Sequence, residues 1–176
     1  SFTNQKGTYI VNENELIENE IVSGVSYSKN ESKITISGIP DKPGISALIF
    51  GLMASNNINV DMIVQNISQD GINANITFTV PNNELDEAKK IIEEKYDELN
   101  YSNLSSDSDI AKISVVGMGM MSQSGVAEKM FTTLAKNKIN IQAISTSEIK
   151  ISVLIKKIYT DLAIQSLHDV YKLDKK

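Results

Sequence analysis

The sequence has no cysteine and no tryptophan, and it has one histidine and three prolines among 176 residues. The absence of cysteine excludes a disulfide framework, a thiol nucleophile and a thiolate metal site. The single histidine, His168, argues against a histidine-based metal site and a Ser-His-Asp triad. We expect it to occupy an ordinary position on a C-terminal helix. The sequence therefore predicts neither catalytic residues nor a metal site.

Positive charge is also sparse, with a net charge of -5 and lysines that do not cluster. Phosphate binding requires clustered Lys and Arg, so we expect no nucleic-acid partner. Apolar runs such as Ala47–Met53 are far shorter than the roughly 20 residues of a membrane span, and residues 1–20 are too polar for a signal peptide. We expect no membrane partner and a cytoplasmic location. The chain begins at Ser1, which fits either a processed product or an expressed fragment.

Motifs for phosphoryl transfer are missing as well. The sequence contains no GxxxxGK[ST] loop, and Gly117-Met-Gly119 lacks the third glycine of a dinucleotide loop. The paired carboxylates Glu93-Glu94 and the run Asp107–Asp109 are expected on a helix face and in a linker, where they are solvated. No part of the sequence predicts a site for phosphoryl transfer.

What the sequence does contain is an internal repeat. Lys33–Gly38 matches Lys112–Gly117, 79 positions later, and Gly44–Ile63 then matches Gly125–Ile144 at an offset of 81. Alternating and helical hydrophobic periods predict the order strand, helix, strand, strand, helix in each copy. A stripe of apolar residues, with Pro43 in the first turn, predicts the first helix from Ile45 to Met53. The second copy repeats the order at 110–117, 125–138, 141–148, 150–157 and 159–171.

A ferredoxin-like βαββαβ module also needs a fourth strand after its second helix. The first copy has a candidate at Asn100–Ser106, but only Lys172–Lys176 follow the last helix of the second copy. The unassigned extended segment is Glu20–Tyr27, and we predict that it supplies the missing strand. The predicted fold is therefore α+β, with two ferredoxin-like modules whose antiparallel sheets carry helices on one face. The first module, 30–106, is inserted in the second, 20–29 plus 107–176.

The loop between strand and helix in the first copy reads GIPDKPGISALIF, from Gly38 to Phe50. A helix N-terminus offers unpaired N–H groups that suit a carboxylate. Nearby acids or amides such as Asp41, Asp61 or Gln65 can receive an ammonium group. The residues alone leave two interpretations open: an amino-acid site, or a proline and glycine that simply begin a helix.

Several long segments resemble the C-terminal regulatory region of aspartate kinases. They are KITISGIPDKPGISALIF, INVDMIVQNIS, ITFTV, IAKISVVGMGM and INIQAISTSEIKISVLI, followed by LAIQSLHDVYKLD. Lys6-Gly-Thr8 resembles the end of the family's kinase domain, so we expect 1–19 to be a remnant of that domain. The Lys-Phe-Gly-Gly-Thr motif of the ATP-binding domain is missing.

This resemblance implies tandem ACT domains that form a homodimer and bind lysine, threonine or both for feedback inhibition. The effector would act on an aspartate kinase catalytic domain, which phosphorylates L-aspartate in the first step of lysine, threonine and methionine biosynthesis. ATP and magnesium belong to that missing domain, so this fragment is expected to need no cofactor and to be inactive alone. The alternatives are a separately translated regulatory subunit, a free-standing amino-acid-binding regulator, and catalysis by the chain itself.

Carried over by position, the resemblance assigns two groups of residues to the effector. The main group is Asp41, Gly44, Ile45, Ser46, Asp61 and Gln65, with Asn140 and Ile141 from a partnering second module. The accessory group is Asn59, Val60, Gln142, Ser145, Thr146 and Ser147. Many relatives have an Arg and then Ser-His-Pro-Gly in the second loop, whereas this chain has Met121-Ser-Gln-Ser-Gly125. This loop is either a second effector site, at Ser122, Gly125, Val126 and Ala127, or structural support for a pseudo-symmetric dimer.

Overall fold

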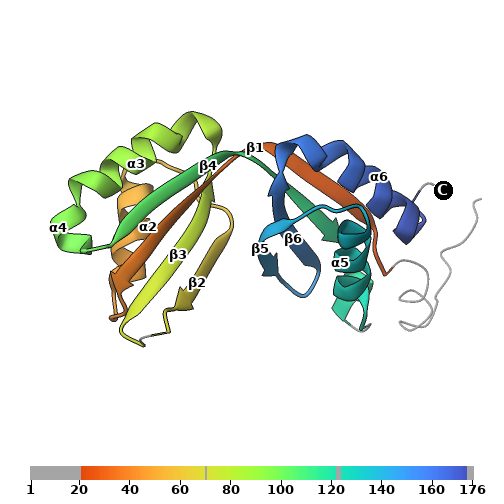
Figure 1. Cartoon of the computed structure of the whole chain (residues 1–176), viewed down its shortest axis with the longest axis horizontal. Helices are drawn as coiled ribbons and strands as arrows, with labels where there is room; N and C mark the ends of the chain where they lie inside the picture. The colour runs from red at the N-terminus through yellow and green to blue at the C-terminus, as the bar shows by residue number, and fades with distance from the viewer. Residues whose placement is uncertain (1–20, 70, 122–123, 174–176) are drawn as a thin grey trace, which may run out of the picture.

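The computed structural model describes residues 21–69, 71–121 and 124–173, and shows one antiparallel sheet with helices packed on it (Figure 1). The six strands lie in the order β2-β3-β1-β4-β6-β5. The elements, in chain order, are β1 Gly24–Pro40, α2 Ile45–Ser55, β2 Ile63–Ile67, β3 Asn73–Val80, η1 Asn82–Glu84, α3 Leu85–Glu94, α4 Tyr96–Leu99, β4 Asn103–Val116, η2 Met118–Met121, α5 Val126–Lys136, β5 Ile141–Thr146, β6 Lys150–Lys156, η3 Lys157–Tyr159 and α6 Thr160–Tyr171. The predicted α+β class is confirmed. The kinase-domain remnant predicted at 1–19 lies outside the described residues.

Two long strands, β1 and β4, run through both repeats. Residues 24–28 of β1 pair with 112–116 of β4, and residues 33–37 pair with 103–107. The register between the two strands shifts on both sides of Glu31. We call residues 30–106 the first half and residues 21–29 with 107–173 the second half. The antiparallel sheets of the two predicted modules are therefore joined into one six-stranded sheet by these shared strands.

The core of the first half lies between the sheet and helices α2 and α3 (Figure 1). Ile45, Ile49 and Met53 of α2 are buried, and the other two members of the predicted stripe, Leu48 and Leu52, pack beside them. Phe78 of β3 is fully buried and meets Phe50 edge to face, with ring centroids 5.4 Å apart. The helical period read from the sequence therefore gives the correct buried face.

The core of the second half lies under α5 and α6. Met130 and Leu134 of α5 and Leu167 of α6 are fully buried against the sheet. Val22, which precedes β1, belongs to the same core and is 7% exposed. A Cβ at Gly117 would lie 2.7 Å from Val22 Cα, so the close approach of these two segments requires glycine there. The residues before β1 thus pack with the second half rather than the first.

The boundaries of several elements differ from the prediction. Helix α2 begins at Ile45, so Pro43 lies in the loop before the helix and not in its first turn. The single helix predicted after β3 is interrupted at Lys95, which has non-helical dihedrals between α3 and α4. Asp107 and Asp109 were expected in a linker, but they lie in β4, which pairs with β1. Of these differences, the one at Asp107 and Asp109 involves a partner strand that is distant in sequence.

Candidate functional site

The loop from β1 to α2 positions a set of polar groups at a helix N-terminus. Gly44 is the N-cap of α2 and takes left-handed dihedrals, φ 94° and ψ -12°, which glycine adopts without strain. The first helical hydrogen bond runs from Leu48 N to Gly44 O, at 2.9 Å. The N–H groups of the first turn therefore have no acceptor within the helix, as at any helix N-terminus, although Ile45 N donates to Lys42 O in the loop at 3.3 Å.

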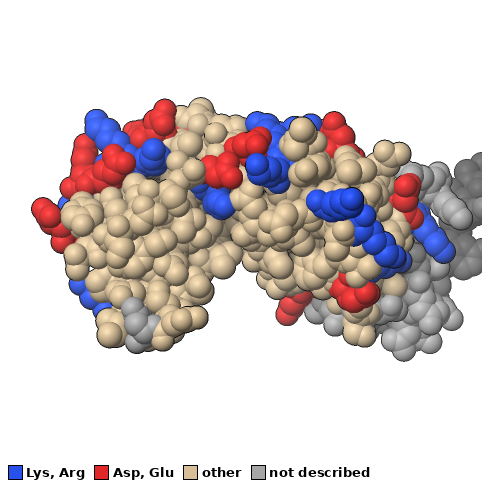
Figure 2. Space-filling model, in the orientation of Figure 1, with Lys and Arg blue, Asp and Glu red and all other residues tan. Residues whose placement is uncertain are grey.

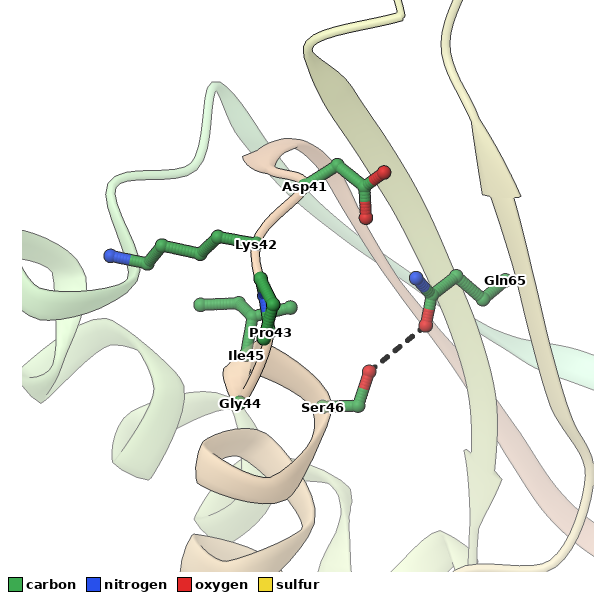
Figure 3. Close-up of a pocket in the computed structure, with 7 residues that line it drawn as sticks. All are labelled: Asp41, Lys42, Pro43, Gly44, Ile45, Ser46 and Gln65. Carbon is green, nitrogen blue, oxygen red and sulfur yellow. Dashed lines mark hydrogen bonds between the residues drawn. The ribbon is translucent and has the colours of Figure 1, made fainter.

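A pocket of about 410 Å³ lies beside this loop, and Gln65 of β2 forms its other wall (Figure 3). The Ser46 hydroxyl donates a hydrogen bond to Gln65 Oε1 across the pocket, at 2.9 Å. Figure 3 shows the Asp41 carboxylate directed toward the same space as the Gln65 amide, whereas Lys42 extends away from both. The remaining lining residues are Pro43, Gly44 and Ile45. The structure therefore gathers five predicted residues, namely Asp41, Gly44, Ile45, Ser46 and Gln65.

These groups offer complementary contacts for a zwitterion. The N-terminus of α2 presents N–H donors and the positive end of the helix dipole, which favour a carboxylate. Asp41 and Gln65 present oxygen acceptors that can receive an ammonium group. Both side chains are exposed in the single chain, so the pocket is open to solvent. The arrangement offers donors for a carboxylate and acceptors for an ammonium group side by side.

Other predicted residues lie elsewhere. Asp61 does not line the pocket; its carboxylate forms an ion pair with Lys112 of β4. Asn59 N donates to Glu84 Oε2 at 3.1 Å, and Val60 packs against the first core. Asn140 is exposed just before β5, and Ile141 begins that strand. None of these residues lines the pocket.

The accessory residues of the second half lie in or just after β5, one of the two edge strands. Gln142 accepts a hydrogen bond from Lys33 Nζ and lies 3.5 Å from Asp107 Oδ2 through its own Nε2. Ser145 and Thr146 pair with β6, and Ser147 N donates to Lys150 O at 2.8 Å. These side chains do not line the pocket of the first half.

The glycine of the second loop has the backbone conformation of the glycine in the first, but its surroundings differ. Gly125 has φ 96° and ψ -7° and is the N-cap of α5, as Gly44 is of α2. Here the hydroxyl of Tyr171, at the end of α6, donates to Val126 O at 2.7 Å. Burial, with the nearby Glu128 carboxylate, raises the pKa of Tyr171 from 10.0 to about 12. Ala127 is packed against the second core, and Ser122 lies outside the described residues.

Two of these contacts escape sequence reasoning. The contact of Tyr171 with Val126 joins the second loop to the last helix, and the pairing of Lys112 with Asp61 joins the two halves. Neither Tyr171 nor Lys112 belongs to a recognisable sequence motif. Tyr171 does fall on the buried face of a predicted helix, which is the one available indication of its contact. Among the described residues there is no group of three His, Asp or Glu side chains that could hold a metal ion, and no helix long and apolar enough to span a membrane.

The class of the protein follows from the comparison of the two halves with known families. The profile of the ACT domain matches residues 28–96 and 113–171, one range in each half. The chain is therefore a tandem ACT-domain protein.

Individual relatives define the family more closely. The chain is 47% identical to the aspartate kinase of Pseudomonas fluorescens over 99% of its own length, but it spans 42% of that relative. It is also similar to a chain in a crystal structure of aspartokinase alpha and beta subunits, with 43% identity and a TM-score of 0.80. The alignment covers 86% of this chain and 99% of that one. The chain also covers 98% of the regulatory subunit of aspartate kinase from Thermus thermophilus, with 36% identity, 85% of this chain aligned and a TM-score of 0.79. The chain belongs to the aspartokinase family and corresponds to its regulatory region.

Proposed function

We propose that this chain confers feedback inhibition on an aspartate kinase by binding lysine, threonine or both. The observation that carries the proposal is the pocket in which Asp41, Gln65 and the N-terminus of α2 meet. The kinase would convert L-aspartate to 4-phospho-L-aspartate with ATP and magnesium in a catalytic domain outside this chain. The relatives matched here are aspartokinases of which the chain spans about 42%, which supports this division of roles.

In the proposed complex, the effector carboxylate binds to first-turn N–H groups of α2, at Ser46 and at Ile45, whose N–H also donates to Lys42 O at 3.3 Å. The Asp41 carboxylate and the Gln65 amide oxygen bind ammonium groups, and the Ser46 hydroxyl holds that amide in place. Charge-assisted hydrogen bonds of this kind contribute about 1.5 to 3 kcal/mol each. Asp61 is outside this set because Lys112 already neutralises it.

We further propose that the site is completed in a homodimer, with Asn140 and Ile141 contributed by the second half of a partner chain. Both edge strands expose apolar side chains: Ile63 and Ile67 of β2 are 47% and 61% exposed, and Ile144 of β5 is 42% exposed. An unpaired edge with exposed apolar residues favours pairing with another chain. Such pairing would cover the open side of the pocket and link effector affinity to dimer geometry.

The same proposal includes the organisation of the chain. The pairing of residues 24–28 with 112–116 supports a first ACT module, 30–106, nested within a second, 20–29 plus 107–176. The second loop is assigned a structural role, because the Val126 carbonyl accepts a hydrogen bond from the Tyr171 hydroxyl. We expect no kinase activity from the isolated chain and a cytoplasmic location for the enzyme.

Calorimetric titration of the chain with lysine and with threonine tests the site. We expect at least one of them to bind, and the Asp41→Asn variant to bind about tenfold or more weakly, because a charged acceptor is lost. The matched control is Asp86→Asn, an exposed aspartate on α3 away from the pocket, which should bind like the parent. The assignment fails if neither amino acid binds, or if Asp41→Asn retains the parent affinity.

A further inference from the structure

Lys112 lies at the centre of an ion cluster that joins the two halves. Its ammonium group contacts Glu31 Oε1 at 2.8 Å and also pairs with Asp61. The side chains of Lys112 and Glu31 are 14% and 10% exposed, whereas that of Asp61 is 44% exposed. Glu31 lies in β1, Lys112 in β4, and Asp61 in the segment that leads into β2. One lysine therefore ties together three segments, one of which belongs wholly to the first half.

The cluster lies where the sheet passes from one half to the other. The β1–β4 register shifts on both sides of Glu31, which is the mark of a bulge and a local bend. Ile113 belongs to the helix-covered core, so its neighbour Lys112 faces the opposite side of the sheet. On that side a separate small cluster contains Met62, Ile110 and Leu154, all buried, with Ala143 packed beside them. Met62 follows Asp61, and Ala143 lies in β5, so contacts from both halves meet here.

We expect these contacts to help hold the halves at one angle. β1 and β4 are the two strands that continue from the first half into the second, and they are irregular at the crossing. The halves form an arch in Figure 1, and Figure 2 shows a notch between them on the side away from the crossing. A two-stranded ribbon twists readily, so its regular hydrogen bonds do not by themselves determine the angle.

The chemistry of Lys112 suits a fixed contact. Burial lowers the pKa of Lys112, but hydrogen bonds to Asp61 and Glu31 outweigh this and raise it above the usual 10.5. The lysine therefore stays charged. Removing its charge would leave Glu31, which is buried, without its cation. A lone buried carboxylate draws in water or moves to reach it, and either response loosens the contact.

We propose that Lys112 is a positioning residue that locks the angle between the two halves by holding Glu31 and Asp61 together. The lock also reaches the pocket, because Asp61 lies four positions before Gln65, which forms a wall of the pocket. Movement of Gln65 on ligand binding is transmitted along β2 to Asp61, and from there to the angle between the halves. This second step rests on the proposed function, whereas the lock itself does not.

The absence of cysteine permits a direct test by pulsed electron spin resonance. Spin labels are attached at Glu87→Cys on α3 and Gln165→Cys on α6, both exposed and in different halves. Labelled chain is diluted with unlabelled chain so that pairs within one molecule dominate. Lys112→Met should broaden and shift the distance distribution. The control Lys90→Met removes an exposed pair with Glu94, 3.8 Å apart, and should leave the distribution unchanged.

Asp61→Asn provides a second variant, because its side chain is 44% exposed and its loss is tolerated more easily than that of Lys112. It should broaden the distance distribution and shift it in the same direction as Lys112→Met. It serves as the test if Lys112→Met does not fold. If a folded variant gives the same distance distribution as the parent in the absence of added amino acid, the proposed lock is wrong.

The coupling to the pocket is measured separately with saturating lysine and threonine. We expect the amino acid that binds to shift the parent distribution, and Lys112→Met to bind it without that shift. A parent that binds without a shift, or a variant that keeps the shift, overturns the coupling. If calorimetry detects no binding to the parent, the proposed function fails, while the ligand-free distances still decide the lock.

Discussion

Replacing Gly44 or Gly125 by alanine should lower the free energy of unfolding through a single physical cause, the backbone conformation at the glycine. Gly44 and Gly125 have φ 94° and 96°, and a Cβ at either position would meet no atom within 4 Å. No steric clash contributes, so the cost comes from the backbone conformation alone. An L-residue in the left-handed region costs about 1 to 2 kcal/mol. Alanine also stiffens the unfolded chain, which offsets about 0.4 to 1 kcal/mol.

Gly44→Ala and Gly125→Ala should therefore each lower the free energy of unfolding by about 1 kcal/mol, and by nearly equal amounts. Urea titration followed by circular dichroism measures both values, with an unchanged slope as evidence that the unfolded states match. Gly51 is the matched control: it is exposed within α2, and a Cβ there also meets nothing within 4 Å. Gly51→Ala should stabilise the chain by up to about 1 kcal/mol.

The same variants separate the roles of the two loops. Gly44→Ala disturbs the pocket wall and should weaken binding of the amino-acid effector, whereas Gly125→Ala should leave its affinity unchanged. Unequal losses of stability without ligand, or a loss at Gly51, would refute the backbone argument. Equal weakening of binding by both variants would refute the assignment of the effector to the first loop.

Two further predictions concern the two cores. Phe78→Ala should lower the free energy of unfolding by about 3 to 5 kcal/mol, since Phe78 is fully buried against Phe50; chemical denaturation measures it, and a loss under 1 kcal/mol would contradict this packing. Tyr171 has its pKa raised from 10.0 to about 12 in the folded chain, so the stability it contributes is complete below pH 10 and is lost as the pH rises through about 12. The Tyr171→Phe variant should lack this pH-dependent part of the stability. The test compares the stability of the parent and the variant from pH 9 to 12, and identical slopes would contradict the prediction.

Local pattern and repetition account for most of what could be predicted. The alternation of Ala74, Ile76 and Phe78 gave a strand, and the spacing of Ile45, Ile49 and Met53 gave the buried face of a helix. Both patterns report which side of one element is apolar, and this information is local. The repeat then supplied the second half from the first.

The missed features depend on partners far apart in the chain. Asp107 and Asp109 read as a linker because their side chains are polar, but the backbone of β4 at this point is held by its ladder with β1. The seven pocket residues lie along one loop and one strand. The loop pattern pointed to Asp41 and Gln65 beside a helix N-terminus, and the resemblance to the family added Gly44, Ile45 and Ser46. Asp61 was expected beside them both as a nearby acid and from the resemblance to the family, but its ion-pair partner, Lys112, lies in another strand.

The shared strands favour one order of folding over the other. Strands β3, β1 and β4 of the first half form from one continuous stretch, and their pairing brings Lys33 next to Asp107. Ser28 and Lys112, which pair at the start of the second half, are distant in sequence but close once that pairing exists. Loop closure is the main entropic barrier to non-local pairing. We therefore expect the first half to form first and to bring the two segments of the second half together.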